Sequence, residues 1–183
     1  MQTFASNWLA GRLGEFPPLH PQLAVRLDTS SRLVDLTRED FDLGIRSGSG
    51  NWPGLIAHFL FKADYAPMLS PALAESIGGV RTPDDLYELP FLGPADPWWR
   101  NWFEAAGETF HPERVIPGPT LGVQAYESIA AMNGQGVAVL TRNLYPVELA
   151  QGRLVQPFET VGSDGDGYWL VYAEARRNAP KVR

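Results

Sequence analysis

The segment "TFASNWLAGRLGEFPPLHPQLAVRLDTSSRLVDLTREDFDLGIR" (residues 3–46) decides the fold class, because helical and extended patterns alternate along it. Its first part predicts an amphipathic helix, with Thr3 placed as the N-cap whose hydroxyl accepts a backbone N–H one turn on. The apolar stripe of this helix consists of Phe4, Trp8, Leu9, Leu13 and Phe16, which recur at helical spacing.

The remainder of this segment predicts three further elements. Residues 23–27 alternate as a strand, with Leu23, Val25 and Leu27 on one face. Ser30 or Ser31 would cap a short helix, and residues 41–46 indicate a second, mostly buried strand. Helix, strand, helix, strand is typical of an α/β domain built on a parallel sheet.

Beyond a loop at residues 47–54, the chain continues with apolar extended segments and clear helix starts. Three pairs of a capping residue and proline mark expected helix N-termini: Ser70-Pro71, Thr82-Pro83 and Asp96-Pro97. The last of these begins "WWRNWFEAAG", which Gly107 ends. The strands expected elsewhere lie over 55–62, 64–70, 91–93, 114–120 and 167–175. A helix is expected over 123–133, followed by a glycine turn and a short strand that ends near 140, and a helix and a strand are expected within 144–158.

Composition indicates an ordinary globular protein, with 44% hydrophobic and 20% charged residues. The chain has no cysteine, so disulfides and cysteine chemistry are excluded. Neither a membrane-length apolar run nor a signal sequence is present, which predicts a cytoplasmic protein without a membrane partner. The net charge is −6, and four basic residues lie in the last eight, so the body is acidic and unsuited to binding phosphates.

Enzyme and metal motifs are incomplete in this sequence. The glycine pairs at 48–50 and 134–136 both lack the third glycine of a dinucleotide-binding loop. "DGDG" at 164–167 resembles the start of a calcium loop, but Ala175 occupies the position of the required glutamate. His20, His58 and His111 are scattered. The sequence therefore predicts no enzyme, no metal site and no cofactor.

Small polar turns instead indicate a ligand cleft, because ligands of parallel sheets bind beyond the carboxyl ends of strands, at helix N-termini. Thr3, the turn at 29–31 and the turn at 122–124 occupy such positions, and Arg46 ends its strand as a possible carboxylate ligand. The alternative is that the hydroxyls are only helix caps and that Arg46 pairs with Asp28 or Asp42.

The segment "FASNWLAGRLGEFPPLHPQLAVRLDTSSRLVDLTREDFDLGIRSGSGNWPGL" is similar to the effector-binding domain of LysR-type transcriptional regulators. Later pieces continue the resemblance over nearly the whole chain: "MLSPAL", "RTPDDL", "WWRNWFEAAG", "SIAAMNGQGVAVL", "LAQGRLVQPF" and "YWLVY". The order and spacing of the pieces carry it, and it is strongest to the branch related to the glycine cleavage activator.

This resemblance implies an α/β, two-lobed fold of the type 2 periplasmic-binding-protein kind, with two crossover strands near 65–69 and 155–158. Lobe I would comprise 1–66 and 158–183, and lobe II 67–157. Members of the family also carry an N-terminal winged helix-turn-helix and a further C-terminal helix, both expected to be absent here. The chain would then be a fragment, a truncated product or an internally started reading frame.

The implied function is to bind a small metabolite, a small anion or amino acid, in the interlobe cleft and so control transcription. The alternative is a stand-alone solute-binding protein of a transport system. The candidate effector-binding residues are Thr3, Phe4, Ser30, Arg46, Gly48, Gly122, Val123 and Gln124.

The resemblance also implies a homodimer or tetramer, and DNA binding only through the missing N-terminal domain. Pairing would use the first helix and the helix over 123–133. Four residues of the second helix are more apolar than one buried stripe requires: Tyr126, Ile129, Ala130 and Met132. The alternative is that all four face the core.

Overall fold

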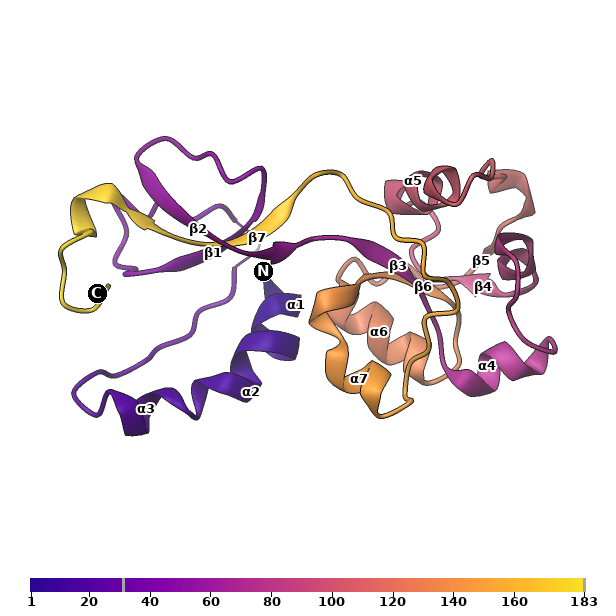
Figure 1. The fold of residues 1–183 in the computed structure, drawn as a ribbon, viewed down its shortest axis with the longest axis horizontal. Coiled ribbons are helices and arrows are strands. Elements are labelled where there is room, and N and C mark those ends of the chain that lie inside the picture. The colour runs from indigo at the N-terminus through magenta and orange to yellow at the C-terminus, as the bar shows by residue number, and fades with distance from the viewer. Residues whose placement is uncertain (31, 183) are drawn as a thin grey trace. The chain divides into compact units, whose positions relative to one another are not determined.

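The computed structural model describes residues 1–30 and 32–182, and the chain in it divides into two compact units (Figure 1). Unit 1 comprises Met1–Ala63 and Gly165–Arg183, and unit 2 comprises Asp64–Asp164. The chain therefore passes from one unit to the other twice. The lobe borders expected from sequence, at 66/67 and 157/158, lie three and seven residues from these passages.

Unit 1 is built on a three-stranded sheet in the order β1-β7-β2. Its strands are β1 (Gly44–Gly48), β2 (Leu55–Lys62) and β7 (Gly167–Ala173). The helical elements are α1 (Gln2–Phe4), a π-helical turn (Ala5–Leu9), α2 (Ala10–Leu13), α3 (Phe16–Leu19) and a 3₁₀ turn (Glu174–Arg176). β7 runs antiparallel to both neighbours, pairing Leu170 with Ile45 and with His58. The predicted parallel sheet is therefore wrong for this unit.

The predicted strand at 23–27 and the predicted short helix after Ser30 or Ser31 are also wrong. Residues 23–30 form no strand, and Val25 and Leu27 are exposed. Residues 32–35 are not helical, and a turn follows at 36–38; the alternative cap Ser31 lies outside the described residues. A strand needs a neighbour to satisfy its backbone groups, and no described strand pairs with 23–30. Local alternation could not reveal that absence.

Aromatic side chains form the core of unit 1. Phe4 is 1% exposed and its ring stacks on those of Trp8, Phe61 and Tyr168, with centroids 5.0, 6.1 and 5.7 Å away. Helical backbone runs over 2–13, so the predicted first helix is confirmed there. Its expected cap is wrong, because the N-cap residue is Met1 and Thr3 lies inside the first turn. Leu36 is also buried, against the sheet at Gly44.

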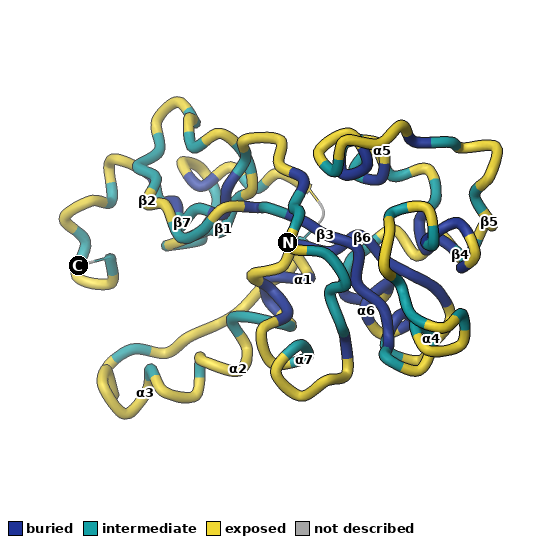
Figure 2. Tube along the Cα trace, turned by 45° about the vertical axis from the view of Figure 1, so that its right-hand side comes forward, coloured by how far each residue is buried: buried dark blue, intermediate teal, exposed yellow. Residues whose placement is uncertain are grey.

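Unit 2 contains two small sheets. β3 (Tyr65–Met68) pairs antiparallel with β6 (Ala138–Thr141), and β4 (Pro90–Phe91) pairs parallel with β5 (Ile116–Pro117). The helices are α4 (Pro71–Ser76), α5 (Pro97–Ala105), α6 (Gln124–Met132) and α7 (Pro146–Ala150), with 3₁₀ turns at Pro83–Glu88, Pro112–Arg114 and Arg142–Leu144. Figures 1 and 2 show α5 on one side of the buried pair β3–β6, and α6 on the other.

The predicted helix starts in unit 2 are confirmed. The Ser70 hydroxyl accepts from the Leu73 N–H at 3.3 Å, and the Asp96 carboxylate accepts from the Trp98 N–H at 2.9 Å. The predicted helix over 123–133 agrees with α6 to within one residue at each end. Five aromatic side chains of the core are at most 1% exposed: Tyr65, Phe91, Trp99, Trp102 and Phe103.

Candidate functional site

In unit 1, two of the predicted effector-binding residues lie at the start of α1. Thr3 is 9% exposed, and Phe4 belongs to the aromatic core described above. A ring that stacks on three other rings contributes to packing, which accounts for the burial of Phe4; contact with an effector stays a prediction. The N-terminal amino group donates to the Ser30 carbonyl at 3.2 Å, which holds the first turn beside the loop that contains Ser30.

The Ser30 hydroxyl accepts from the Arg32 N–H at 3.1 Å. This is a local turn of the kind that serine hydroxyls commonly form. Among the described residues, none from 32 to 43 is helical, so the predicted role of Ser30 as a helix cap is wrong.

Arg46 projects from β1, where it is half-buried. One guanidinium nitrogen donates to the Val34 carbonyl at 2.8 Å, and the group lies over the Trp52 ring at 5.6 Å from its centroid. Neither Asp28 nor Asp42 is its partner; Asp42 pairs instead with Arg176 at 3.1 Å. A guanidinium has five N–H donors, so Arg46 keeps the capacity to bind a carboxylate while the Val34 bond orients it.

Gly48 ends β1 in a conformation that favours glycine, with φ of 149°. Its carbonyl accepts from the Trp169 indole N–H at 2.9 Å, and a Cβ there would come within 3.1 Å of the Trp52 ring. Gly48 and Arg46 therefore share Trp52 as a neighbour, which places two of the predicted residues around one indole.

In unit 2, Gly122, Val123 and Gln124 form the turn that leads into α6. Gly122 has φ of 72°, which a residue with a Cβ rarely adopts, and Val123 is the N-cap residue. The Gln124 side chain makes two hydrogen bonds to Thr141: its carbonyl accepts from the Thr141 N–H at 2.8 Å, and its amide donates to the hydroxyl at 3.2 Å. Gln124 thus fastens the start of α6 to the end of β6.

The predicted residues fall into two groups, five in unit 1 and three in unit 2. In unit 1, the Met1–Ser30 bond holds Thr3 and Phe4 beside Ser30, while Arg46 and Gly48 share Trp52 as a neighbour. In unit 2, the three residues are consecutive in the chain. That all eight face one ligand remains a prediction.

A cluster of three hydrogen-bond donors around the Asp164 carboxylate in unit 2 was not predicted. Asp164 accepts from the Trp98 indole at 2.7 Å, the Tyr65 hydroxyl at 2.9 Å and the Asn101 amide at 2.9 Å. Burial raises the pKa of Tyr65, and the Asp164 carboxylate beside it raises the pKa further, so the phenol stays a hydrogen-bond donor. The cluster joins residues up to 99 positions apart, and no local pattern could have revealed it.

A second unpredicted feature is the burial of charge in α6. Glu127 is 8% exposed, whereas the apolar side chains of Tyr126 and Ile129 are 52% and 54% exposed. Burial raises the pKa of Glu127, the nearby Asp96 carboxylate raises it further, and a hydrogen bond from the Gly122 backbone opposes both effects. Of the other two apolar residues of this helix that were predicted to support pairing, Ala130 packs into the core and Met132 is half-buried.

The LysR substrate binding domain family model matches residues 1–183. The chain is 37% identical over 175 residues to the HTH-type transcriptional activator AmpR of Rhodobacter capsulatus, covering 95% of this chain and 58% of that protein. It is 31% identical over 183 residues to the glycine cleavage system transcriptional activator of Escherichia coli K12, covering 100% of this chain and 59% of the relative. The chain thus spans about three fifths of the length of these relatives.

A solved structure gives the same result for the fold. The effector domain of the transcriptional regulator AmpR of Pseudomonas aeruginosa superposes with a TM-score of 0.80 at 30% identity, covering 98% of this chain and 85% of that one. The predicted α/β fold of the type 2 periplasmic-binding-protein kind is confirmed. Among the described residues, no helix has the length and apolar character needed to span a membrane.

Proposed function

Because this chain belongs to the family of LysR substrate-binding domains, we propose that it is the effector-sensing part of a transcription regulator. The observation that carries the proposal is that the family match extends over all 183 residues, with relatives named as transcriptional activators and not as enzymes or transport proteins. This is why a stand-alone solute-binding protein is not favoured.

We propose that the effector is a small anion or amino acid that contacts both units, with Arg46 binding its carboxylate. The charge-assisted bond available from the guanidinium, held by Val34 and Trp52, supports this assignment. A ligand that prefers one arrangement of the two units shifts their equilibrium toward it, by no more than its differential affinity for the two arrangements. The two passages of the chain from unit to unit would serve as hinges.

The whole protein's partners follow from the same family membership. We propose that copies associate in part through α6, where the exposed Tyr126 and Ile129 lie one turn apart while the polar Glu127 is buried. DNA would be bound by a helix-turn-helix part, as the name of the AmpR relatives indicates, and not by these 183 residues. Their net charge of −6 opposes an approach to phosphates.

The test of the sensing role is to expose the protein to the small-molecule fraction of a host-cell extract and to identify bound ligand by native mass spectrometry. We expect one small carboxylate or amino acid to be retained. Arg46→Gln should weaken its binding by about 1.5–3 kcal/mol, the contribution of a hydrogen bond to a charged group. Arg177→Gln, an exposed arginine of the same unit, is the matched control. Equal retention by both variants would remove Arg46 from the site.

A further inference from the structure

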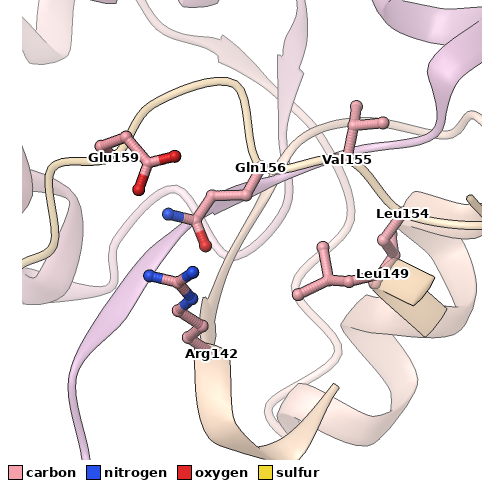
Figure 3. Close-up of a pocket in the computed structure, with 6 residues that line it drawn as sticks. All are labelled: Arg142, Leu149, Leu154, Val155, Gln156 and Glu159. Carbon is pink, nitrogen blue, oxygen red and sulfur yellow. The ribbon is translucent and has the colours of Figure 1, made fainter. Parts of the chain in front are cut away.

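Unit 2 contains a pocket that none of the predicted effector-binding residues lines (Figure 3). Its volume is about 320 Å³, which is at the small end of the range for ligand pockets. The lining residues are Arg142, Leu149, Leu154, Val155, Gln156 and Glu159. Arg142 follows β6, Leu149 belongs to α7, and the other four lie on the segment that returns toward unit 1. The pocket therefore belongs entirely to unit 2.

The polar and apolar lining residues are segregated. Figure 3 shows the polar ends of Arg142, Gln156 and Glu159 gathered on one side, and Leu149 and Leu154 on the other. The Arg142 and Glu159 side chains are exposed, and neither makes an ion pair with any residue that the structure describes. Opposite charges thus border one opening without neutralising each other.

Gln156 adds a polar atom that lacks a partner. Its side-chain carbonyl oxygen is buried and accepts no hydrogen bond from the described residues, while its amide donates to the Phe158 carbonyl at 2.6 Å. A buried, unpaired acceptor costs about 1–3 kcal/mol. A ligand that brings an N–H donor to this oxygen would recover that cost.

We propose that this pocket binds a small aliphatic α-amino acid. Its carboxylate would bind the Arg142 guanidinium, its ammonium group would donate to the Glu159 carboxylate and the Gln156 oxygen, and its side chain would lie against the partly exposed Leu149. A zwitterion carries both charges within a few atoms, and this suits a cation and an anion at one opening. Since all the groups lie in unit 2, the proposal does not depend on effector binding by Arg46.

The test is isothermal titration of the 183-residue protein with L-leucine, L-leucinamide, which lacks the carboxylate, and 4-methylpentanoate, which lacks the ammonium group. We expect leucine to bind about tenfold more tightly than either analogue, as the loss of one charge-assisted bond predicts. Arg142→Gln should lower the leucine affinity about tenfold and leave that of leucinamide unchanged. Glu159→Gln should do the same for leucine and leave 4-methylpentanoate unchanged.

Arg81→Gln and Glu75→Gln are matched controls, since both are exposed side chains of unit 2 that do not line the pocket. They should bind leucine as the unmodified protein does. NMR shift changes on leucine addition should centre on Leu149 and Leu154. The proposal is overturned if leucine does not bind, if all three compounds bind equally, or if the shift changes centre on unit 1.

Discussion

Replacing Gln124 by alanine tests whether this residue has a structural role in unit 2. The substitution removes the acceptor of the Thr141 N–H, at 2.8 Å, and the donor to the Thr141 hydroxyl, at 3.2 Å. Thr141 is 0% exposed, so its N–H would be left buried and unpaired, which costs about 1–3 kcal/mol. Alanine is favourable in a helix and adds no penalty of its own. We therefore expect unit 2 to lose about 2 kcal/mol of unfolding free energy.

The assay is hydrogen exchange of the β6 amides under native conditions at increasing urea, because a chain of two units need not unfold in one step. The Thr141 amide should lose protection first. Gln135→Ala, an exposed glutamine of the same unit, should change the unfolding free energy by less than about 0.5 kcal/mol. Unchanged Thr141 protection in Gln124→Ala, with an unfolding free energy equal to that of Gln135→Ala, would refute the structural role.

Three further predictions concern charge and association. Because the pKa of Glu127 is raised in the folded state, its contribution to stability is complete below the ordinary glutamate pKa and is lost as the pH rises through the folded value. In thermal melts, Glu127→Gln should therefore become more stable relative to the unmodified protein as the pH rises. A stability difference that stays constant with pH would contradict this. In sedimentation, Ile129→Glu should shift the protein toward the monomer, whereas Val147→Glu, a control at another exposed residue, should not. If the unmodified protein is a monomer at high micromolar concentration, association through α6 is excluded. Fluorescence polarisation near physiological salt should show no operator-selective binding by residues 1–183, and tight selective binding would contradict the assignment of DNA contacts to another part of the protein.

Sequence alone predicted unit 2 well, because its helix starts are determined locally. Ser70 and Asp96 each accept a backbone N–H two or three residues ahead, and each precedes a proline that suits the first turn. The glycine conformation at Gly122 and the apolar pattern after it likewise set the start of α6. Such signals need no knowledge of distant parts of the chain.

Unit 1 was predicted less well because its sheet depends on partners far away in sequence. β7 lies between β1 and β2, about 120 residues after β1, and its antiparallel direction cannot be inferred from the alternation of helices and strands at 3–46. The segment 23–30 has a strand pattern but no described strand beside it. Pairing, and not pattern, decides whether such a segment becomes a strand.

For the candidate site too, local features could be predicted from sequence and contacts between distant residues could not. Arg46 and the 122–124 turn could be selected from sequence because strand ends and helix starts are local features. The contacts that hold them, Val34 for Arg46 and Thr141 for Gln124, join residues 12 and 17 positions apart in sequence. The Asp164 cluster joins residues up to 99 positions apart, so only the structure could show it. The pocket beside Arg142 is lined by residues within 142–159, but its shape depends on how that segment folds back on itself.

Hydrogen exchange of the 183-residue protein, with and without the small-molecule fraction of a host-cell extract, tests the sensing role most directly. An effector that contacts both units should slow exchange around Arg46 and Gly48 in unit 1 and around Gly122–Gln124 in unit 2 at the same ligand concentration. At that ligand concentration, Arg46→Gln should reduce both changes together. Protection at only one of these two groups, or at neither with any extract fraction, would contradict the sensing role.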